Sequence, residues 1–282
     1  MKKLEVDAYH RVAPLIAASE MKGCRAKWCS VLEGRQIGSI FVDDPTHPQT
    51  ALVCGRRVGQ YYGFGEANGE LLRPFVPELL SEHLPEGFCT LFATSEAWRE
   101  TLDTLFTRGY TRTAFDFRPP AGWPEPGWQQ AIPAGFSLRR ADAAGIEMMS
   151  EEIRGWVGSM WNGIDHFLAQ EVGFCMISNG TVVSMCVPTV IGGGEAETQI
   201  WTHGEFRGRG LAKLTATAYV EQCVARGLKP GWTCNSDHHV SAALAQKVGF
   251  VPVGTIYGYP LERSYQLSQG RWGPAAGEPD DR

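Results

Sequence analysis

Residues 195–212 read Glu195-Ala-Glu-Thr-Gln-Ile-Trp-Thr-His-Gly-Glu-Phe-Arg-Gly-Arg-Gly-Leu-Ala212, and this stretch decides the fold that the sequence predicts. Ile200, Trp201 and Thr202 favour a strand, because β-branched and aromatic residues suit a pleated, half-buried surface. Residues 204–210 form a glycine-rich turn. The apolar residues after it recur at roughly helical spacing, at Leu211, Leu214, Ala218 and Cys223. The stretch therefore predicts a strand, a glycine loop and a helix in that order.

The predicted loop has the features of an anion site. It brings several backbone N–H groups and the positive end of a helix dipole to one point, which suits a phosphate or a pyrophosphate. Arg207 and Arg209 add positive charge and bidentate donors. The loop follows neither the Gly-x-Gly-x-x-Gly nor the Walker pattern, and it lacks the Lys-Ser/Thr pair that serves a nucleotide with Mg²⁺. From the loop alone, a plain helix cap with chance arginines stays an alternative.

Composition excludes several classes of function. A chain of 282 residues predicts about two domains. The net charge of −5 argues against a nucleic-acid partner, since phosphate contacts need a surplus of Lys and Arg. Arg-Gly tracts that bind nucleic acid are also usually repeated in basic sequence, whereas this one occurs once. No apolar run approaches the roughly 20 residues of a membrane span, and the start carries no signal peptide, so we expect a cytoplasmic protein without a membrane partner.

The eight cysteines show no paired Cys-x-x-Cys motif. Cys175, Cys186 and Cys223 lie in apolar surroundings and are predicted to be reduced core residues, as in a cytosolic protein.

The first half of the chain is predicted to alternate short strands and helices. An amphipathic helix is expected over residues 4–21, weakened by Pro14, and a helical stretch over 71–80 is interrupted by Pro74 and Pro77. Ser95 is the predicted N-cap of a helix that runs to about Arg108. Strands are expected at Trp28–Leu32, Ile37–Val42, Ala51–Cys54, Gly59–Phe64, Gly87–Ala93 and Thr111–Phe117.

The second half follows a segment dense in Pro and Gly, residues 119–126, which is the predicted domain boundary. Asp142 opens a helical region to about Leu168, which Gly155 and Gly158 can break. A hairpin is expected around Asn179-Gly180, because this pair accepts the positive φ angles of a two-residue turn. The remaining predicted elements are strands at 136–139, 228–234 and 250–259 and a helix at 239–248. The expected domains are 1–125 and 133–265, followed by a disordered tail at 266–282.

Residues 133–265 resemble the GNAT superfamily of acyl-coenzyme A-dependent N-acyltransferases. Its signature, [Arg/Gln]-x-x-Gly-x-[Gly/Ala], is matched in full by Arg207-Gly-Arg-Gly-Leu-Ala212, and the order of predicted elements agrees. The whole chain resembles the two-domain family that includes the zwittermicin A resistance acetyltransferases. The residues that carry this resemblance are 31–34, 41–44, 173–174, Glu197 ahead of Thr202, 230–232 and 241–250. It implies a mixed α/β (α+β) protein with a GNAT fold in the C-terminal half and a degenerate GNAT-like N-terminal half.

The resemblance also implies site residues and acetyl-CoA as cosubstrate, with no metal. A protonated amine, with a pKa of about 10, cannot attack a thioester, so a base must remove its proton. Glu197 matches the strand carboxylate that serves as base, often through water, in many GNAT enzymes; the alternative is a surface carboxylate on an edge strand. The residues expected to bind the coenzyme are Ile200, Trp201, Thr202, Arg207, Gly208, Arg209, Gly210, Leu211, Ala212, His238 and Ser241.

The sequence departs from the family pattern where a proton is returned to the leaving thiolate. The tyrosine that many GNAT enzymes use there falls at Ala245. Tyr257, Tyr259 or His238 are possible substitutes, although tyrosines on a strand are more often packing residues. A thiolate with a pKa near 8.5 can also leave without a dedicated acid. His238 is close in sequence to His239 and Cys234, which are residue types that bind metals. These residues lack the fuller ligand set of a metal site.

We expect no second coenzyme site in the first half of the chain. Glu66 follows the glycine turn there and would repel a pyrophosphate. We therefore expect direct acetyl transfer, in a ternary complex, to the primary amine of a small molecule. A non-catalytic acyl-CoA sensor and a longer-chain acyltransferase are the alternatives. The oligomeric state stays open.

Overall fold

The structure of the chain, a computed structural model, describes residues 1–19, 21–23, 25–55, 59–82, 88–262, 266–268 and 271–273. They divide into two compact units, and each unit is assembled from separate chain segments. Unit 1 comprises Met1–Met21, Ile37–Arg112 and Thr255–Arg282; unit 2 comprises Lys22–Gln36 and Thr113–Gly254. This division differs from the consecutive domains 1–125 and 133–265, since residues 22–36 join unit 2 and residues from 255 onward join unit 1.

Unit 1 contains a sheet with the strand order β1-β2-β3-β4-β5-β12. Its strands are β1 (Lys2–Lys3), β2 (Gly38–Val42), β3 (Thr50–Gly55), β4 (Gln60–Gly65) and β5 (Phe88–Ala93). The strand β12 (Phe250–Glu262) belongs to unit 1 from Thr255 onward, and β13 (Gln266–Ser268) and β14 (Arg271–Gly273) form a separate pair. Its helices are η1 (Val6–Val12), α1 (Ala13–Ala17), α3 (Gly69–Leu72), η2 (Arg73–Phe75), α4 (Val76–Glu82) and α5 (Glu96–Leu105).

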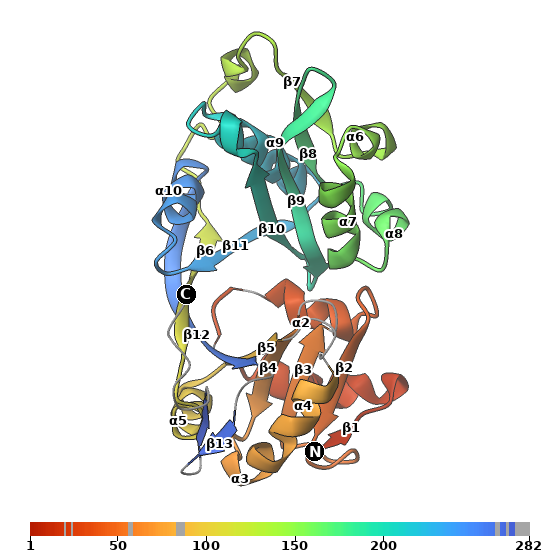
Figure 1. Cartoon of the computed structure of the whole chain (residues 1–282), viewed down its shortest axis with the longest axis vertical. Coiled ribbons are helices and arrows are strands. Elements are labelled where there is room, and N and C mark those ends of the chain that lie inside the picture. The colour runs from red at the N-terminus through yellow and green to blue at the C-terminus, as the bar shows by residue number, and fades with distance from the viewer. Residues whose placement is uncertain are drawn as a thin grey trace. The chain divides into compact units, whose positions relative to one another are not determined.

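Unit 2 contains the strands in the order β12-β6-β11-β10-β9-β8-β7. Its strands are β6 (Tyr110–Phe117), β7 (Ser137–Arg140), β8 (Phe174–Ser178), β9 (Thr181–Gly192), β10 (Glu195–Thr202), β11 (Lys229–Asn235) and the start of β12. Its helices are α2 (Arg25–Leu32), η3 (Trp128–Ala131), α6 (Ala143–Glu147), α7 (Glu151–Met160), α8 (Ile164–Leu168), η4 (Gly204–Phe206), α9 (Leu211–Ala225) and α10 (His239–Lys247). Figure 1 shows α6, α7 and α8 beside β8 and β9.

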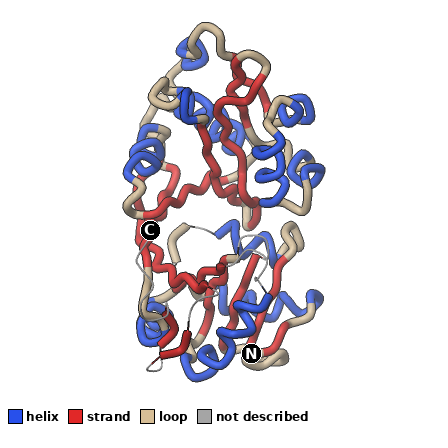
Figure 2. The backbone as a smooth tube through the Cα atoms, in the orientation of Figure 1, coloured by secondary structure: helices blue, strands red, loops and turns tan. Residues whose placement is uncertain are grey.

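Both units use the same sequence of strand directions. In unit 2, antiparallel strands lead to β10, which pairs in parallel with β11 after a crossover through α9. In unit 1, antiparallel strands lead to β4, which pairs in parallel with β5 after a crossover through α3 and α4. Helices and strands are both substantial in each unit (Figure 2). The structure is therefore the predicted mixed α/β fold, with a second, degenerate copy of the motif in unit 1.

Several local predictions are confirmed. Asn179 and Gly180 have φ angles of +49° and +75°, and they join Ser178 of β8 directly to Thr181 of β9. Both angles are those that a type I′ hairpin turn requires. The side chains of Ser95 and Asp142 cap α5 and α6 by accepting backbone N–H bonds.

The predictions for residues 28–32 and for the lengths of β9 and β10 are wrong. Residues 28–32 form the end of helix α2 rather than a strand, although Trp28 and Val31 favour strands. Contact with β9 overrides that preference: Gly192 is so close to α2 that an added Cβ would lie 2.3 Å from the backbone nitrogen of Ser30. The strands β9 and β10 also extend further than predicted, because Gly193 and Gly194 form a second two-residue turn with positive φ.

The helical expectations for the N-terminal region hold only in part. Residues 4–21 form two short helices, η1 and α1, and Pro14 lies in the first turn of the second. Part of the expected tail forms β13 and β14, and residues 274–282 lie outside the described residues.

The core of unit 2 surrounds α9, which is buried over most of its length and packs on β8–β11. A helix that is apolar on most faces belongs inside a domain. Trp161, fully buried after α7, anchors that helix by donating its indole N–H to the carbonyl of Pro188 on β9 at 3.0 Å. Of the helices that the structure describes, none is long and apolar enough to cross a lipid bilayer.

Candidate active site

The strands β10 and β11 run side by side for a short distance and then separate. Among the described residues, β10 pairs with β11 only over Glu195–Glu197, opposite Lys229–Gly231. The strand continues to Thr202 and stays paired with β9, with an irregular register between Glu197 and Thr198. The edge of β10 on the β11 side is therefore open from Thr198 onward.

The backbone of Ile200 and Thr202 faces this open edge. The N–H of His203 donates to the carbonyl of Val183 on β9 at 2.9 Å. Backbone groups alternate between the two edges of an antiparallel strand, so Trp201 also turns to β9, and Ile200 and Thr202 turn the other way. An extended ligand along this edge would find backbone donors and acceptors at alternate residues.

The loop after β10 exposes residues 207–210. Gly208 and Gly210 have φ angles of +76° and +79°, which favour glycine, and no described atom lies within 4 Å of a Cβ built on either. Within the described residues, no side chain caps α9, whose N-cap is Gly210. The N–H groups of Leu211 and Ala212 therefore lack acceptors within the helix, and together with the helix dipole they form a candidate anion site.

Both loop arginines are held by backbone carbonyls. Arg207 donates from Nε to the carbonyl of Thr202 at 3.1 Å, and Arg209 donates from Nη2 to that of Glu205 at 3.2 Å. The Arg209 guanidinium also lies 5.2 Å from the ring centroid of Phe206. Because a guanidinium carries five N–H donors, each arginine retains donors for an anion at this loop.

The carboxylate of Glu197 lies where β10 and β11 are last paired, and the residue is 3% exposed. Its Oε1 atom accepts a hydrogen bond from Thr233 Oγ1 at 2.5 Å and lies 3.5 Å from Lys27 Nζ. A Cβ on Gly231 would come within 2.9 Å of Oε2. The alternative of a surface carboxylate on an edge strand is therefore wrong, since Glu197 is a buried acid with a cationic and a hydroxyl partner.

Comparison with known proteins places the chain in a family. A family model described as GNAT acetyltransferase matches residues 22–259. The chain belongs to the GNAT acetyltransferase family. It is 28% identical over 244 residues to the uncharacterized N-acetyltransferase YdfB of Bacillus subtilis (strain 168), a match that covers 84% of this chain and 91% of that protein.

Solved structures agree with the assignment. A GCN5-related N-acetyltransferase-like protein from Streptococcus suis 89/1591 superposes with a TM-score of 0.68 at 25% identity, covering 90% of this chain and 99% of that one. A tandem GNAT protein from the clavulanic acid biosynthesis pathway shares the fold, with a TM-score of 0.55 at 13% identity and coverage of 91% and 94%. The chain is thus an N-acetyltransferase of the GNAT family with a tandem-like architecture.

Members of the GNAT family generally use acetyl-CoA, and the residues present fit that group. The anion site at residues 207–212 has the exposed N–H groups, positive-φ glycines and arginine donors that a pyrophosphate needs. The open edge at Ile200 and Thr202 has the backbone groups that an amide-containing pantetheine arm needs. These residues would hold the coenzyme, while the side chain of Trp201 lies half-buried against the core.

His238 and Ser241 have structural partners at the start of α10. His238 caps the helix, its Nδ1 accepting the N–H of Ser241 at 3.2 Å. Ser241 Oγ accepts the indole N–H of Trp232 at 3.1 Å. A contact of either residue with the coenzyme stays a prediction. In the part of the chain that the structure describes, no group of three or more His, Cys, Asp or Glu could hold a metal ion.

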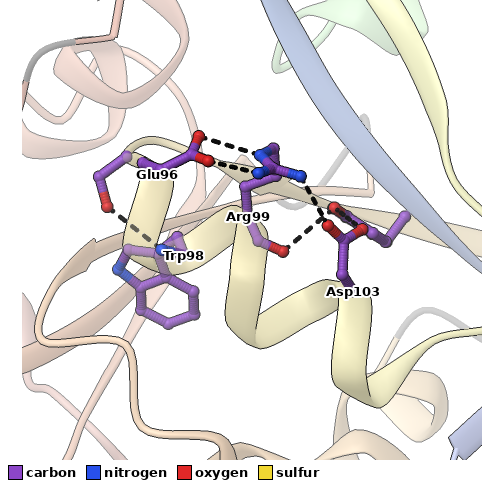
Figure 3. A network of polar contacts seen from close by, with 6 residues as sticks. Glu96, Trp98, Arg99 and Asp103 are labelled. Atoms are coloured by element: carbon purple, nitrogen blue, oxygen red, sulfur yellow. Dashed lines mark hydrogen bonds and ion pairs between the residues drawn. The ribbon is translucent and has the colours of Figure 1, made fainter.

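The two tyrosines considered as proton donors belong to unit 1. The Tyr259 hydroxyl donates to Asp103 Oδ1 at 2.7 Å and contacts the Arg99 carbonyl at 3.3 Å. Burial, together with Asp103, raises the pKa of Tyr259. Figure 3 shows Arg99 held between Glu96 and Asp103 on α5, and its guanidinium lies 5.5 Å from the ring centroid of Tyr257. Tyr259 thus has a hydrogen-bonding role in unit 1, and Tyr257 has a cation–π contact with Arg99 there.

Among its described residues, unit 1 shows no counterpart of the candidate anion site in unit 2. Its parallel pair spans Gln60–Gly63, and β4 ends two residues later at Gly65, so hardly any open edge follows. A cavity of about 510 Å³ near its glycine turn is lined in part by Glu66, Glu70 and Glu100. Three carboxylates oppose a pyrophosphate electrostatically. The prediction of a single coenzyme site per chain is consistent with this arrangement and stays a prediction.

Sequence reasoning missed the residues that surround Glu197. Thr233 follows the Pro230–Trp232 motif directly, so its position on the strand beside Glu197 could have been found from the predicted parallel pair. Lys27 carried no signal, because it lies 170 residues before Glu197 in the chain and on a helix that was predicted as a strand.

Proposed function

We propose that this N-acetyltransferase moves an acetyl group from acetyl-CoA to the primary amine of a small molecule, with Glu197 as the general base. The observation that carries the proposal is the position of the Glu197 carboxylate, buried at the last paired residue of β10, directly before the open edge. A carboxylate at this point would lie beside an acyl group delivered along that edge.

The proposed reaction begins when Glu197 accepts a proton from the ammonium form of the acceptor, directly or through water. The neutral amine attacks the acyl carbon, the carbon–sulfur bond breaks and the thiolate leaves, and the nitrogen of the new amide gives its second proton to the thiolate or to water. Bound acetyl-CoA supplies the activated acyl group as a thioester. Backbone N–H groups at the open edge, such as that of Ile200 or Thr202, would stabilise negative charge on the carbonyl oxygen.

Direct transfer is favoured over a covalent acyl-cysteine. Burial raises the pKa of Cys89, Cys175 and Cys223 to about 12 each, so their thiols are poor nucleophiles near neutral pH. The seven cysteines that the structure describes are all buried, and none of them forms a disulfide. Reduced thiols in a folded core also support the cytoplasmic location that we propose.

The departing thiolate is proposed to leave without a dedicated tyrosine. Ala245, at the position where many family members have tyrosine, is fully buried and has no proton to give. A coenzyme A thiolate with a pKa of about 8.5 is a stable leaving group near neutral pH.

The acceptor is proposed to be a small, cationic amine. The net charge of −5 is compatible with such substrates. More specifically, we propose that the acceptor is an amino-bearing antibiotic or metabolite, because the chain resembles the zwittermicin A resistance enzymes.

The test is release of free thiol from acetyl-CoA across a panel of amines. Glu197→Gln should lower kcat at neutral pH by about 10²- to 10⁴-fold, the usual contribution of a general base, with little change in coenzyme binding. Arg207→Ala should weaken coenzyme binding and leave kcat at saturating coenzyme nearly unchanged.

Each alternative predicts a different result. A non-catalytic acyl-CoA sensor would bind the coenzyme yet release no thiol with any amine. A longer-chain acyltransferase would prefer longer acyl-CoAs in direct competition with acetyl-CoA. Unchanged turnover in Glu197→Gln would remove Glu197 from the mechanism while leaving the transferase activity in place.

A further inference from the structure

The cation beside Glu197 comes from a distant part of the chain. Lys27 lies on α2, and its Nζ atom is 3.5 Å from Glu197 Oε1; the two side chains are 11% and 4% exposed. At this exposure an ion pair is shielded from solvent, and removing one partner leaves an uncompensated buried charge. The pair therefore differs from the exposed ion pairs of this chain, such as Arg35 with Glu33.

The segment that carries Lys27 is fixed to the rest of unit 2 directly after the C-terminal end of α2. Gln36 donates from Nε2 to the carbonyl of Met160 at 2.8 Å, and Glu33 accepts the backbone N–H of Gly193 at 2.7 Å. The close approach of α2 to Gly192 removes the space for any side chain there. Lys27 is thus held in a defined position relative to β10.

The other charged groups near Glu197 are partly occupied with one another. Glu195, two residues earlier on β10, lies 3.7 Å from Lys229, which also bonds Asp116 at 3.1 Å. Arg25 on α2 acts electrostatically on Glu195 and on the Cys29 thiol. Lys27 is therefore the cation in direct contact with Glu197, and Thr233 is its hydroxyl partner.

We propose that Lys27 is a positioning residue for the proposed acetyl transfer: it orients the Glu197 carboxylate. Because Lys27 and Thr233 both bind Oε1, they leave Oε2 to face the acceptor or a water molecule. Through Lys27, the segment 22–36 accordingly contributes to the unit that carries Glu197, although it precedes the rest of that unit by 76 residues, the length of Ile37–Arg112. This inference rests on the proposed role of Glu197.

The test compares two substitutions at Lys27 with a matched control in the same segment. Lys27→Met keeps an unbranched side chain that is one heavy atom shorter and removes the charge. It should lower kcat by about 10- to 100-fold, the loss expected when a reacting group is misplaced by about an ångström. Lys27→Arg retains the cation and should recover much of this loss. Lys22→Met removes an exposed lysine and should leave kcat unchanged. The KM for acetyl-CoA should change little in all three.

A double-mutant cycle separates positioning from folding. If Lys27 acts through Glu197, Lys27→Met should lower kcat no further in a Glu197→Gln background, and the double variant should unfold at a higher urea concentration than Lys27→Met alone. Equal losses of kcat in both backgrounds would overturn the inference, as would wild-type kcat in Lys27→Met. The double variant, which buries no unpaired charge, keeps the test available if Lys27→Met alone fails to fold.

Failure of the proposed function has a different signature. If the wild-type chain releases no thiol from acetyl-CoA with any amine, the transferase proposal falls, and the role of Lys27 falls with it. If the wild type is active and Glu197→Gln is impaired while Lys27→Met is not, only the role of Lys27 is lost. Acetylation of Lys27 during turnover, detected by peptide mass, would also overturn the inference, because it removes the charge.

Discussion

Thr233 on β11 donates its hydroxyl hydrogen to Glu197 Oε1 on β10 across 2.5 Å, at the place where the two strands separate. This bond joins the proposed base to the strand on the far side of the opening. The position of the carboxylate therefore depends on how β10 and β11 are placed where they separate.

Replacing Thr233 tests this dependence. Thr233→Val keeps the shape and removes the hydroxyl, and a hydrogen bond to a charged group contributes about 1.5–3 kcal/mol. We expect kcat to fall by about 10- to 100-fold, with coenzyme affinity unchanged by calorimetric titration. Thr233→Ser keeps the donor and should retain most of the activity. Wild-type turnover in Thr233→Val would show that this bond does not serve catalysis.

A side chain at Gly231 is predicted to displace the Glu197 carboxylate. A Cβ at this position would lie 2.9 Å from Glu197 Oε2, closer than such contacts occur, so Gly231→Ala should displace the carboxylate. We expect kcat to fall by about tenfold or more, since small displacements of a reacting group are costly. Gly155→Ala on α7 is the control: no described atom lies within 4 Å of its Cβ, and alanine favours a helix interior by up to about 1 kcal/mol. Equal kcat values in the two variants would contradict the prediction.

The buried cysteines should be unreactive in the folded chain. With a pKa of about 12, the thiols of Cys89, Cys175 and Cys223 would be ionised in only about one molecule in 10⁴ at a pH of about 8. We expect iodoacetamide to label these residues only after unfolding in urea, as read by peptide mass mapping. Rapid labelling of Cys175 in the native chain would show that its surroundings open in solution. Low thiol reactivity would also give a low background in a thiol-release assay.

Glu195 should make stability depend on pH. Burial raises the pKa of Glu195 above its ordinary value of 4.5, reinforced by Glu197 and Asp116 and opposed by Lys229 and Arg25. The native carboxyl therefore keeps its proton at pH values where the unfolded chain has lost it, so this group's contribution to stability falls as the pH rises through and above 4.5. Glu195→Gln removes the titration. Urea unfolding should show that the free energy of unfolding of the variant, relative to that of the wild type, is higher at about pH 8 than at about pH 5. The same difference in free energy at both pH values would contradict the prediction.

Local sequence patterns predicted the elements whose stability is local. The Asn179-Gly180 turn, the Ser95 and Asp142 caps and the start of α9 after Gly210 all appear as expected. Each depends on backbone angles or hydrogen bonds between residues close in the chain. The turn at Gly193-Gly194 carried the same kind of signal and was missed, so β9 and β10 were predicted too short.

By itself, the sequence determined the family and the fold class and predicted the anion loop at 207–212 and the candidate base Glu197, because the residues behind these inferences lie in one short, patterned stretch. Only the tertiary structure decided which side chains surround that base. Lys27 reaches Glu197 through a helix whose residues favour a strand locally, and contact with Gly192 on β9 outweighs that preference. Burial and long-range packing set these contacts, and they depend on residues far apart in the chain, which no local pattern records.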